Sequence, residues 1–256
     1  MFLREKKKRI SMITASIVLY KENLETLNKT VDSFLSTPLE KKLYLIDNSP
    51  ENTLQNHFKQ QNIEYIFVGN NLGFGKAHNI VLDKINSDFH LILNPDVIFS
   101  SDVITTLINE LKTKSEVSFI TPRVVYPNKG LQYVCRIHPT FFDLINRKIK
   151  ISKNQIIKNE YRNKDLEKPF YPEFIHGCFM LFKTEDFKNL KGFDERYFLY
   201  MEDADLCRKI DKTGKKKLYF PKVEIIHQHQ KGSSKSLKLF FRHTSSAIKY
   251  FLKWGI

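Results

Sequence analysis

Three carboxylates gather at one point of the chain, where Glu202, Asp203 and Asp205 follow a strongly aromatic run. Apolar residues then recur at helical spacing as far as Thr213, so a helix should begin at about Glu202. A helix N-terminus stabilises negative charge, and such capping accounts for one acid but not for three. A carboxylate held beside an apolar pocket can act as a general base toward a hydroxyl. The sequence therefore indicates Asp203 or Glu202 as a proton acceptor.

A second candidate is Asn94-Pro95-Asp96, which follows the short apolar run 89–93. Such a run, bounded by turn residues, predicts a buried strand, and Pro95 cannot donate to a sheet ladder. In an open α/β sheet, ligands collect outside the carboxyl ends of the strands. Asp96 is therefore placed to meet a cation or a phosphate-bearing ligand, although a plain loop leading to the next helix is an alternative.

Strands alternate with helices over the first half of the chain, which predicts a parallel, doubly wound α/β sheet. The expected strands are 12–19, 42–47, 63–68, 89–93 and 117–121, and the expected helices are 24–34, with Asn23 as N-cap, 53–60, 73–85 and 103–111. The turn residues 20–22, 47–49, 69–75 and 94–96 then fall at one edge of one sheet.

The second half has a less regular pattern. A hairpin is expected over 124–134, a basic, partly helical insertion over 136–168, a strand over 174–182, a short helix capped by Thr184 and ended by Gly192, and strands at 218–220 and 223–227. The tail from Ser236 to Trp254 is amphipathic and carries basic residues such as Lys235 and Lys253. It predicts a helix that either lies in a bilayer interface or docks on the domain.

The composition is that of an ordinary globular protein, with 41% hydrophobic and 27% charged residues in 256. The formal charge of +14, from 42 Lys plus Arg against 28 Asp plus Glu, suggests polyanionic neighbours. Nucleic acid is one such neighbour, but no nucleic-acid fold pattern is present. The remaining options are phosphorylated ligands and an anionic membrane.

The three cysteines, Cys135, Cys178 and Cys207, are widely spaced and follow no disulfide or zinc pattern. We expect buried, reduced thiols. The basic start from Met1 to Arg9 leads into an interrupted apolar run, so we expect no signal peptide. No run approaches the roughly 20 apolar residues that a spanning helix needs.

Taken in order, the motifs resemble those of the family 2 glycosyltransferases, and within them the bacterial rhamnosyltransferase branch that builds O-antigens and related surface polysaccharides. The resemblance runs from about Met12 to Ser234. It is carried by Ser16-Ile17-Val18-Leu19-Tyr20, Asp47-Asn48-Ser49, Asn71-Leu72-Gly73-Phe74-Gly75-Lys76-Ala77-His78-Asn79, Asn94-Pro95-Asp96, Gly192-Phe193-Asp194-Glu195, Glu202-Asp203-Ala204-Asp205-Leu206-Cys207 and Ile226-His227.

The resemblance implies a GT-A fold, with one Rossmann-like mixed sheet flanked by helices. Residues 1–234 would form the glycosyltransferase domain, in which 12–121 bind the nucleotide sugar and 122–234 bind the acceptor and carry catalysis. Residues 235–256 lie beyond the resemblance and would form the amphipathic helix, for which contact with a membrane surface is one of the two expectations given above.

The same resemblance implies an inverting transfer from a nucleoside diphosphate sugar. Asp203 matches the usual base; Glu202 is the fallback, with an acceptor-binding role preferred. The acceptor-binding residues would be His176, Gly177, Tyr200 and Glu202. The donor-binding residues would be Leu19, Tyr20, Glu22, Asp47, Asn71, Gly73, Phe74, Gly75, Asn79, Asn94 and Asp96.

A divalent cation, Mg²⁺ or Mn²⁺, is implied at Asp96 and His227, where it would offset the charge of the departing diphosphate. Asn94 stands where many members have a first acid, which puts strict metal dependence in doubt. Structural alternatives remain at three places: Asp47 as an Asx turn, Gly73 and Gly75 as a tight turn, and His227 as a packing residue. His229 alternates away from the site on an extended chain.

The implied reaction moves L-rhamnose from dTDP-rhamnose to a polyprenyl-diphosphate-linked glycan. The enzyme would act in the cytoplasm, as a peripheral protein at the inner face of the cytoplasmic membrane. Three alternatives remain: another donor, such as a nucleotide-linked hexose, N-acetylhexosamine or galactofuranose; a nucleic-acid-binding protein; and an idle scaffold with the same fold.

Overall fold

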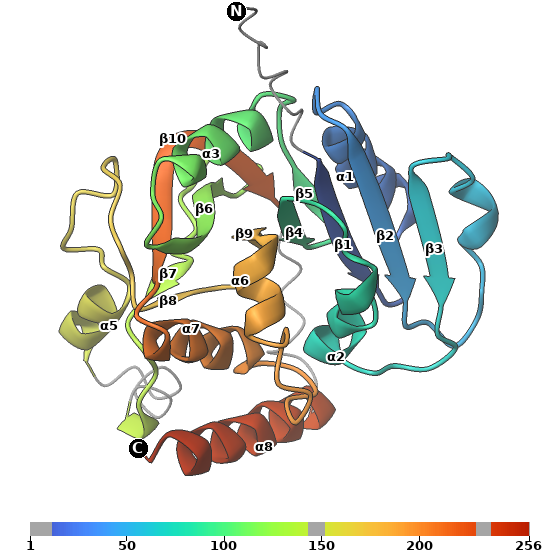
Figure 1. The fold of residues 1–256 in the computed structure, drawn as a ribbon. Helices are drawn as coiled ribbons and strands as arrows, with labels where there is room; N and C mark the ends of the chain where they lie inside the picture. Colours follow the sequence, from blue (N-terminus) through green and yellow to red (C-terminus); the bar gives the residue numbers. More distant parts are fainter. Residues whose placement is uncertain (1–11, 143–151, 229–236, 256) are drawn as a thin grey trace, which may run out of the picture.

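The computed structural model describes residues 12–142, 152–228 and 237–255 (Figure 1). Eight of its strands form one mixed sheet in the order β3-β2-β1-β4-β9-β6-β10-β5. The strands are β1 (Ile13–Leu19), β2 (Lys41–Asp47), β3 (Ile63–Phe67), β4 (Phe89–Leu93), β5 (Val97–Ile98), β6 (Val117–Val125), β9 (Phe179–Lys183) and β10 (Lys216–His227), and a separate pair is formed by β7 (Cys135–Arg136) and β8 (Phe174–Ile175).

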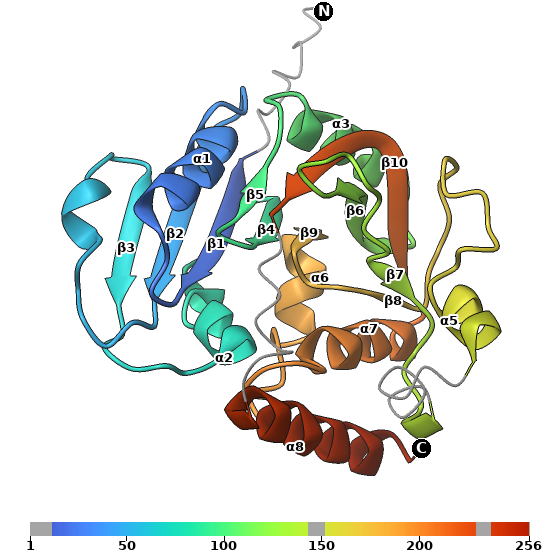
Figure 2. The ribbon, with the colours of Figure 1, turned by 180° about the vertical axis from the view of Figure 1, so that it is seen from behind.

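Helices cover both faces of the sheet: in Figure 1, α6 lies in front of it and α1 lies behind β2, and Figure 2 shows the reverse order. The helices are α1 (Leu24–Leu35), α2 (Phe74–Asn79), α3 (Val103–Lys112), α5 (Lys153–Asn159), α6 (Thr184–Asn189), α7 (Glu202–Lys212) and α8 (Leu237–Trp254), with short 3₁₀ turns η1 (Gln55–His57) and η2 (Leu82–Lys84).

The strand directions confirm the mixed sheet and place the site. β1 to β4 are mutually parallel, as expected from the alternating pattern, but β9 runs antiparallel between β4 and β6. β10 is parallel to β6. The carboxyl ends of β1, β2, β4, β6 and β10 therefore share one edge with the beginning of β9. The loops at that edge carry most of the predicted site residues.

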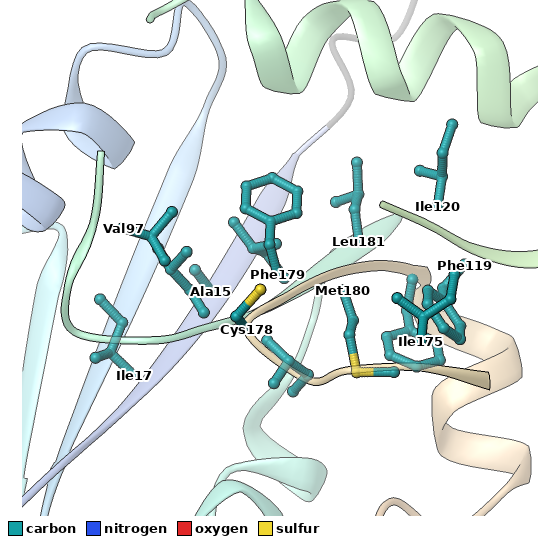
Figure 3. Close-up of a cluster of buried hydrophobic side chains, with 14 of the residues drawn as sticks. Ala15, Ile17, Val97, Phe119, Ile120, Ile175, Cys178, Phe179, Met180 and Leu181 are labelled. Atoms are coloured by element: carbon teal, nitrogen blue, oxygen red, sulfur yellow. The ribbon is translucent and has the colours of Figure 1, made fainter. Parts of the chain in front are cut away.

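Apolar side chains from distant strands fill the core between the sheet and its helices. Figure 3 shows Ala15 and Ile17 of β1 in one cluster of buried hydrophobic side chains with Val97, Phe179 and Leu181, all of them fully buried. The polar residues Thr14 and Ser16 of β1 point to the opposite face, because a strand directs successive side chains to opposite faces. On that second face, the Ser16 hydroxyl lies 2.7 Å from His78 Nδ1 and 3.0 Å from His90 Nε2.

This buried polar ladder fixes α2 on the sheet, because His78 belongs to α2 and His90 to β4. Thr14 extends it, with its hydroxyl 2.8 Å from His90 Nδ1. Burial lowers the pKa of both imidazoles, that of His90 to about 3. Both rings are therefore neutral at physiological pH and can accept a hydrogen bond from a hydroxyl.

Three expected elements are wrong in detail. The run 174–182 is two strands, because the chain turns at Gly177: the Cys178 N–H donates to His176 O at 3.0 Å, and β8 pairs with β7 while β9 pairs with β4. The strands 218–220 and 223–227 are one strand, β10, whose pairing shifts between Phe220 and Glu224. Pro221 explains that shift, since it donates no ladder hydrogen bond.

Helix boundaries also differ from the expectations. Asn23 is confirmed as a cap, because its side chain accepts from the Thr26 N–H at 3.0 Å. Thr184 is instead the first residue of α6, whose N-terminus has no side-chain cap. The helix expected over 73–85 ends at Asn79 and is followed by η2, and only η1 forms within 53–60.

The hairpin expected over 124–134 is present as an antiparallel bridge between Val125 and Leu131. The basic insertion is described in part, and its helix is α5. Residues 143–151 of the insertion lie outside the described residues, as do His229, Lys235 and the basic start 1–9. Within the described ranges, no helix combines the length and apolarity that crossing a membrane requires.

The amphipathic tail forms α8, which docks on the domain below α7 (Figure 1, Figure 2). Tyr250 is fully buried, and its hydroxyl accepts from Arg208 Nε at 2.6 Å. Asp205 of α7 is also fully buried and accepts from Trp254 Nε1 at 2.8 Å and from Lys253 Nζ at 2.6 Å. The third acid of the carboxylate cluster therefore holds α8 in place.

Candidate active site

The turn after β4 carries Asp96, which lies beside His227 at the end of β10. His227 Nε2 is 3.3 Å from Asp96 Oδ1, and both side chains are largely buried. The two residues meet because Val97 of β5 pairs with His227. Thr30 of α1 fixes the turn from the other side: its hydroxyl donates to Pro95 O at 2.8 Å and accepts from Val97 N at 3.1 Å. The sheet and α1 together position Asp96.

His227 is oriented by Gln132, a residue that the sequence pattern did not single out. Gln132 Oε1 lies 3.0 Å from His227 Nδ1, and Gln132 Nε2 donates to His227 O at 2.6 Å. Burial opposes the charged imidazole, but Cys178 and Asp96 outweigh it and raise the pKa of His227 to about 10. Asn94 also lies here, with Nδ2 3.4 Å from His227 Nε2.

Glu22 and Asp47 face the same corner from β1 and β2. Burial first, then the negative charges of Asp96 and Asp47, raise the pKa of Glu22 to about 7. Asp47 is fully buried, and both of its oxygens are occupied: one accepts from Ser49 N at 2.8 Å and the other from the Tyr65 hydroxyl at 2.5 Å. Asp47 thus forms the Asx turn that the sequence left open.

The remaining residues at the end of β1 differ in exposure. Leu19 is fully buried and its carbonyl accepts from Asn48 N at 2.9 Å, whereas Tyr20 is 46% exposed. Asn48 Nδ2 in turn donates to Gly73 O at 3.0 Å. The β2 turn is therefore tied directly to the predicted donor segment, the 71–79 loop.

The 71–79 loop packs against the 192–201 loop so closely that its glycines are required. A Cβ on Gly73, whose φ is +87°, would lie 2.0 Å from Phe198 O, and one on Gly75 would lie 2.7 Å from Phe193 Cβ. The Phe74 N–H donates to Phe198 O at 3.1 Å. Both glycines therefore permit contact between the two loops.

Asn79 links the same two loops by paired hydrogen bonds. Its Oδ1 accepts from Phe193 N at 2.9 Å, and its Nδ2 donates to Phe193 O at 2.8 Å. Gly192 allows this approach, since a Cβ there would lie 2.2 Å from Asn79 Oδ1. Asn71 closes the start of the loop by accepting from Gly73 N at 3.0 Å. The amide of Asn79 is thus engaged with protein backbone.

Asn79→Asp should lower the stability by about 2 kcal/mol, because a carboxylate oxygen would replace the amide N–H that faces Phe193 O. We expect the melting temperature to fall by about 4–8 °C, measured by differential scanning calorimetry. Lys76→Ala is the matched control: it breaks an exposed 3.4 Å pair with Glu195 between the same loops and should change stability by less than about 1 kcal/mol. Equal effects of the two changes would contradict this assignment.

Asp203 is the second residue of α7 and lies against His176 and Gly177. Its Oδ2 accepts from Gly177 N at 3.2 Å and is 3.3 Å from His176 Nδ1, while Oδ1 accepts from Ala204 N at 2.8 Å. The N-terminus of α7 further favours a negative charge. Gly177 stands between Asp203 and Phe74: a Cβ on Gly177 would lie 3.6 Å from Asp203 Cβ and 3.6 Å from Phe74 Cε1. The expected acceptor and donor segments therefore meet at Gly177, beside Asp203.

Glu202 differs from its neighbour. It is 6% exposed, and its Oε2 has no hydrogen-bond partner among the described residues. Burial, followed by the charge of Asp203, raises the pKa of the Glu202 carboxyl well above its usual range. Tyr200 and Met201, directly before it, both have left-handed backbone, with φ of +68° and +69°. Such conformations cost about 1–3 kcal/mol each and persist only where surrounding structure holds them.

Glu202→Gln should make the protein more stable at neutral and alkaline pH. Because the pKa of Glu202 is raised, the folded protein binds this proton more tightly than the unfolded chain does. Wild-type stability therefore falls as the pH rises from about 4.5 through the folded-state pKa, where the folded protein must lose the proton. Glutamine removes this cost. We expect the difference in melting temperature between variant and wild type to grow by about 3 °C or more between pH 5 and pH 8. A difference that is constant across this range would contradict the assignment.

The described residues contain no group of three or more His, Cys, Asp or Glu side chains that could hold a metal ion by themselves. Asp96 and His227 nevertheless bring a carboxylate and an imidazole, two side chains of the kinds that ligate divalent cations, to one corner of the site.

The chain resembles known proteins over most of its length. The model of the family described as "Glycosyl transferase family 2" matches residues 14–190, and one described as "N-terminal domain of galactosyltransferase" matches residues 162–231. The chain belongs to glycosyltransferase family 2. It is accordingly an enzyme that transfers a sugar from a nucleotide sugar, and the nucleic-acid-binding alternative is set aside.

Two relatives of this glycosyltransferase are named as rhamnosyltransferases. Rhamnosyltransferase WbbL of Escherichia coli (strain K12) is 30% identical over 75% of this chain and 74% of the relative. The N-acetylglucosaminyl-diphospho-decaprenol L-rhamnosyltransferase of Mycobacterium tuberculosis (strain CDC 1551 / Oshkosh) is 25% identical over 79% of this chain and 70% of the relative. The resemblance to the rhamnosyltransferase branch is confirmed.

Solved structures confirm the GT-A fold of this glycosyltransferase. GalNAc-T7 with UDP, GalNAc and Mn²⁺ superposes with a TM-score of 0.67 at 15% identity, over 88% of this chain and 44% of that one. The mannosyltransferase PcManGT from Pyrobaculum calidifontis, in complex with GDP-Man and Mn²⁺, gives a TM-score of 0.64 at 14% identity, over 96% of this chain and 64% of that one. The chain thus spans less than two thirds of each.

Proposed function

We propose that this glycosyltransferase moves L-rhamnose from dTDP-rhamnose, with inversion, to a polyprenyl-diphosphate-linked glycan used in O-antigen or surface polysaccharide synthesis. The names of the two relatives support the sugar, and that of the mycobacterial one supports a lipid-linked acceptor. The observation that carries the proposal is the shared sheet edge, where the Asp96–His227 pair, the 71–79 loop and Asp203 come together.

In the proposed reaction, Asp203 is the base. Its carboxylate takes the proton of the acceptor hydroxyl as that oxygen forms a bond to the anomeric carbon of the donor. The bond from that carbon to the diphosphate oxygen breaks on the opposite face, and the nucleoside diphosphate leaves. Glu202 is 6% exposed, so its carboxylate is less accessible to an acceptor hydroxyl. We assign it to the acceptor side of the site with His176, Gly177 and Tyr200.

At the other end of the site, Asp96 and His227 would hold a Mg²⁺ or Mn²⁺ ion against the diphosphate. The bound cation supplies positive charge that offsets the charge developing on the leaving group. Asn94 contributes an amide rather than an acid, so the cation would use few protein ligands and depend on the diphosphate oxygens. The Mn²⁺ in both solved structures supports a divalent ion.

The proposed donor site uses the ends of β1 and β2 and the 71–79 loop. Glu22, Tyr20 and the backbone at Leu19 would border the base and ribose, with Asp47 holding the adjacent turn. Gly73 and Phe74 would close over the donor sugar. We propose accordingly that residues 12–121 serve mainly the donor and 122–234 the acceptor, with the enzyme peripheral at the inner face of the cytoplasmic membrane.

A panel of nucleotide sugars with Mn²⁺ tests the donor assignment through protection against thermal unfolding. We expect dTDP-rhamnose to raise the melting temperature most, and radiolabelled rhamnose to appear on a polyprenyl-diphosphate sugar acceptor. Greater protection by a UDP- or GDP-linked sugar, followed by its transfer, would replace rhamnose with that sugar. Binding without transfer of any sugar would favour an idle scaffold.

A further inference from the structure

Helix α8 has apolar side chains on two opposite faces. Its inner face docks on the domain: Ser246, Ala247 and Tyr250 are nearly or fully buried. Its outer face carries Ile248, which is 55% exposed, and Leu252, which is 80% exposed. Residues four apart lie on one side of a helix, so these two side chains form one stripe that faces away from the protein. Docking of the inner face leaves this outer apolar stripe exposed to solvent, so the stripe is a second apolar surface that a partner could bury.

The outer stripe continues in both directions. Phe241, seven residues before Ile248, is 67% exposed on the same side of α8. Beside the other end of the helix lie Phe141, which is 57% exposed, and Phe142, which is 80% exposed. The Phe141 ring is 6.1 Å from that of Phe251, so the two segments touch although they are 110 positions apart in the sequence. We call Phe141, Phe142, Phe241, Ile248 and Leu252 the apolar strip.

Charge indicates what covers the apolar strip. Helix α8 contains four basic residues, Lys238, Arg242, Lys249 and Lys253, and no Asp or Glu, in a chain of net charge +14. An outer apolar stripe on a helix whose charged residues are all basic is typical of helices that lie in the interface of an anionic bilayer. The lipid-linked acceptor of the proposed function places the substrate in such a bilayer, and the present inference rests on that function in this respect.

The inner face of α8 holds the 192–201 loop, which leads directly into Glu202 and Asp203. Ser246 Oγ donates to Leu199 O at 2.9 Å, and Lys249 Nζ donates to Arg196 O at 2.8 Å. The Arg242 guanidinium lies 3.7 Å from the centroid of the Phe198 ring. These contacts span the loop that meets the 71–79 loop through Phe198 O.

The same helix contacts the strained end of this loop. The His243 ring lies edge-on to Tyr200, with 5.0 Å between their centroids, and Tyr200 and Met201 are the two consecutive left-handed residues. Strained backbone is retained only where its surroundings hold it. On this segment the surroundings include α8, so the position of α8 bears on the arrangement of the residues that carry Asp203.

We propose that α8 couples bilayer binding to this loop: the apolar strip enters an anionic membrane while the inner face remains docked on residues 196–200. The bilayer can favour this arrangement because a docked α8 holds its outer stripe beside the segment of Phe141, whose ring lies 6.1 Å from that of Phe251. A ligand shifts a conformational equilibrium only by its difference in affinity for the two states. Membrane contact then stabilises the loop that presents Asp203 to the acceptor.

Vesicle flotation tests the surface. Wild-type protein should float with vesicles of phosphatidylglycerol and phosphatidylethanolamine at low salt, and less with phosphatidylcholine or at high salt. Leu252→Ser and Phe142→Ser should each lower the bound fraction at least threefold. Phe67→Ser is the matched control, since Phe67 is 39% exposed on β3, at the far edge of the sheet. Flotation of the strip variants equal to wild type, or no flotation of wild type, would overturn the assignment.

The single tryptophan reports whether α8 stays docked. Trp254 Nε1 donates to Asp205 on the inner side, so brominated lipids should quench its fluorescence weakly when the apolar strip is in the bilayer. Strong quenching would mean that α8 leaves the domain and would overturn the coupling. This measurement requires no catalysis, so it remains decisive if the proposed sugar transfer itself fails.

Turnover with a short-chain, water-soluble acceptor tests the coupling directly, because this acceptor does not need the membrane. Anionic vesicles should raise wild-type kcat at least threefold and leave Leu252→Ser unchanged. Ser246→Ala removes the contact with Leu199 O and should bind vesicles as wild type does, with a smaller rise in kcat. Equal kcat of wild type with and without vesicles, or full stimulation of Ser246→Ala, would overturn the coupling.

Discussion

Asp203→Asn is expected to lower kcat for sugar transfer by about 10²–10⁴-fold, the usual contribution of a positioned general base. Asparagine has nearly the same shape and can still accept a hydrogen bond from Gly177 N or Ala204 N, but it cannot take a proton from the acceptor. The change should therefore affect turnover and leave donor binding intact. Initial rates at saturating donor and acceptor, together with calorimetric titration of the donor nucleotide, separate the two effects.

Glu185→Gln is the matched control for this experiment. Glu185 is also a carboxylate in the first turn of a helix, α6, but it is exposed and lies away from the shared edge. We expect wild-type turnover from it. If Asp203→Asn retains turnover within tenfold of wild type, Asp203 is not the base, and Glu202 becomes the candidate, because Asp205 is bound to Trp254 and Lys253.

Asp96→Asn should reduce kcat/KM by about 10²-fold or more and remove most of the response to Mn²⁺. The 94–97 turn holds the Asp96 carboxylate 3.3 Å from His227. Without this carboxylate, His227 would be the one member of the pair left to bind the proposed cation. Less positive charge would then face the leaving diphosphate. Activity measured against Mn²⁺ concentration, at fixed donor, checks this expectation.

Asn94→Asp provides the reciprocal change at the same turn. It adds a second carboxylate to the turn that carries Asp96 and should lower the Mn²⁺ concentration for half-maximal activity severalfold. Asp102→Asn, an exposed acid just before α3, should behave as wild type. Full Mn²⁺-dependent activity of Asp96→Asn would show that the cation binds elsewhere.

Much of the site edge could be predicted from local patterns. Pro95, Gly69 and the Asp47 turn mark where buried strands end, and parallel strands bring such ends together. The sequence therefore predicted that Glu22, Asp47 and Asp96 share an edge, and the structure confirms that placement. It did not single out Gln132, which orients His227 from a hairpin, because a lone glutamine among apolar residues carries no periodic signal.

Other features depend on contacts between residues far apart in the chain. The paired hydrogen bonds between Asn79 and Phe193 join positions 114 apart in the sequence. The residues of the 71–79 loop by themselves therefore indicate a nucleotide-binding segment and do not reveal that this loop packs against the 192–201 loop. Asp205 is adjacent to two site acids but points to Trp254 and Lys253. The break at Gly177 is hidden within a continuous apolar run, because hydrophobic periodicity does not distinguish one strand from two.

The insertion of β9 between β4 and β6 has a consequence for synthesis on the ribosome. Both neighbours are made before β9, and about sixty residues separate the end of β6 from the end of β9. At roughly 5–20 residues per second, the nascent chain carries these two strands for about 3–12 seconds without the partner between them. Unpaired strand edges promote association with other chains. We expect newly made chains to need chaperone protection over this interval, and substitutions that delay β9 pairing to reduce soluble yield more than they reduce equilibrium stability.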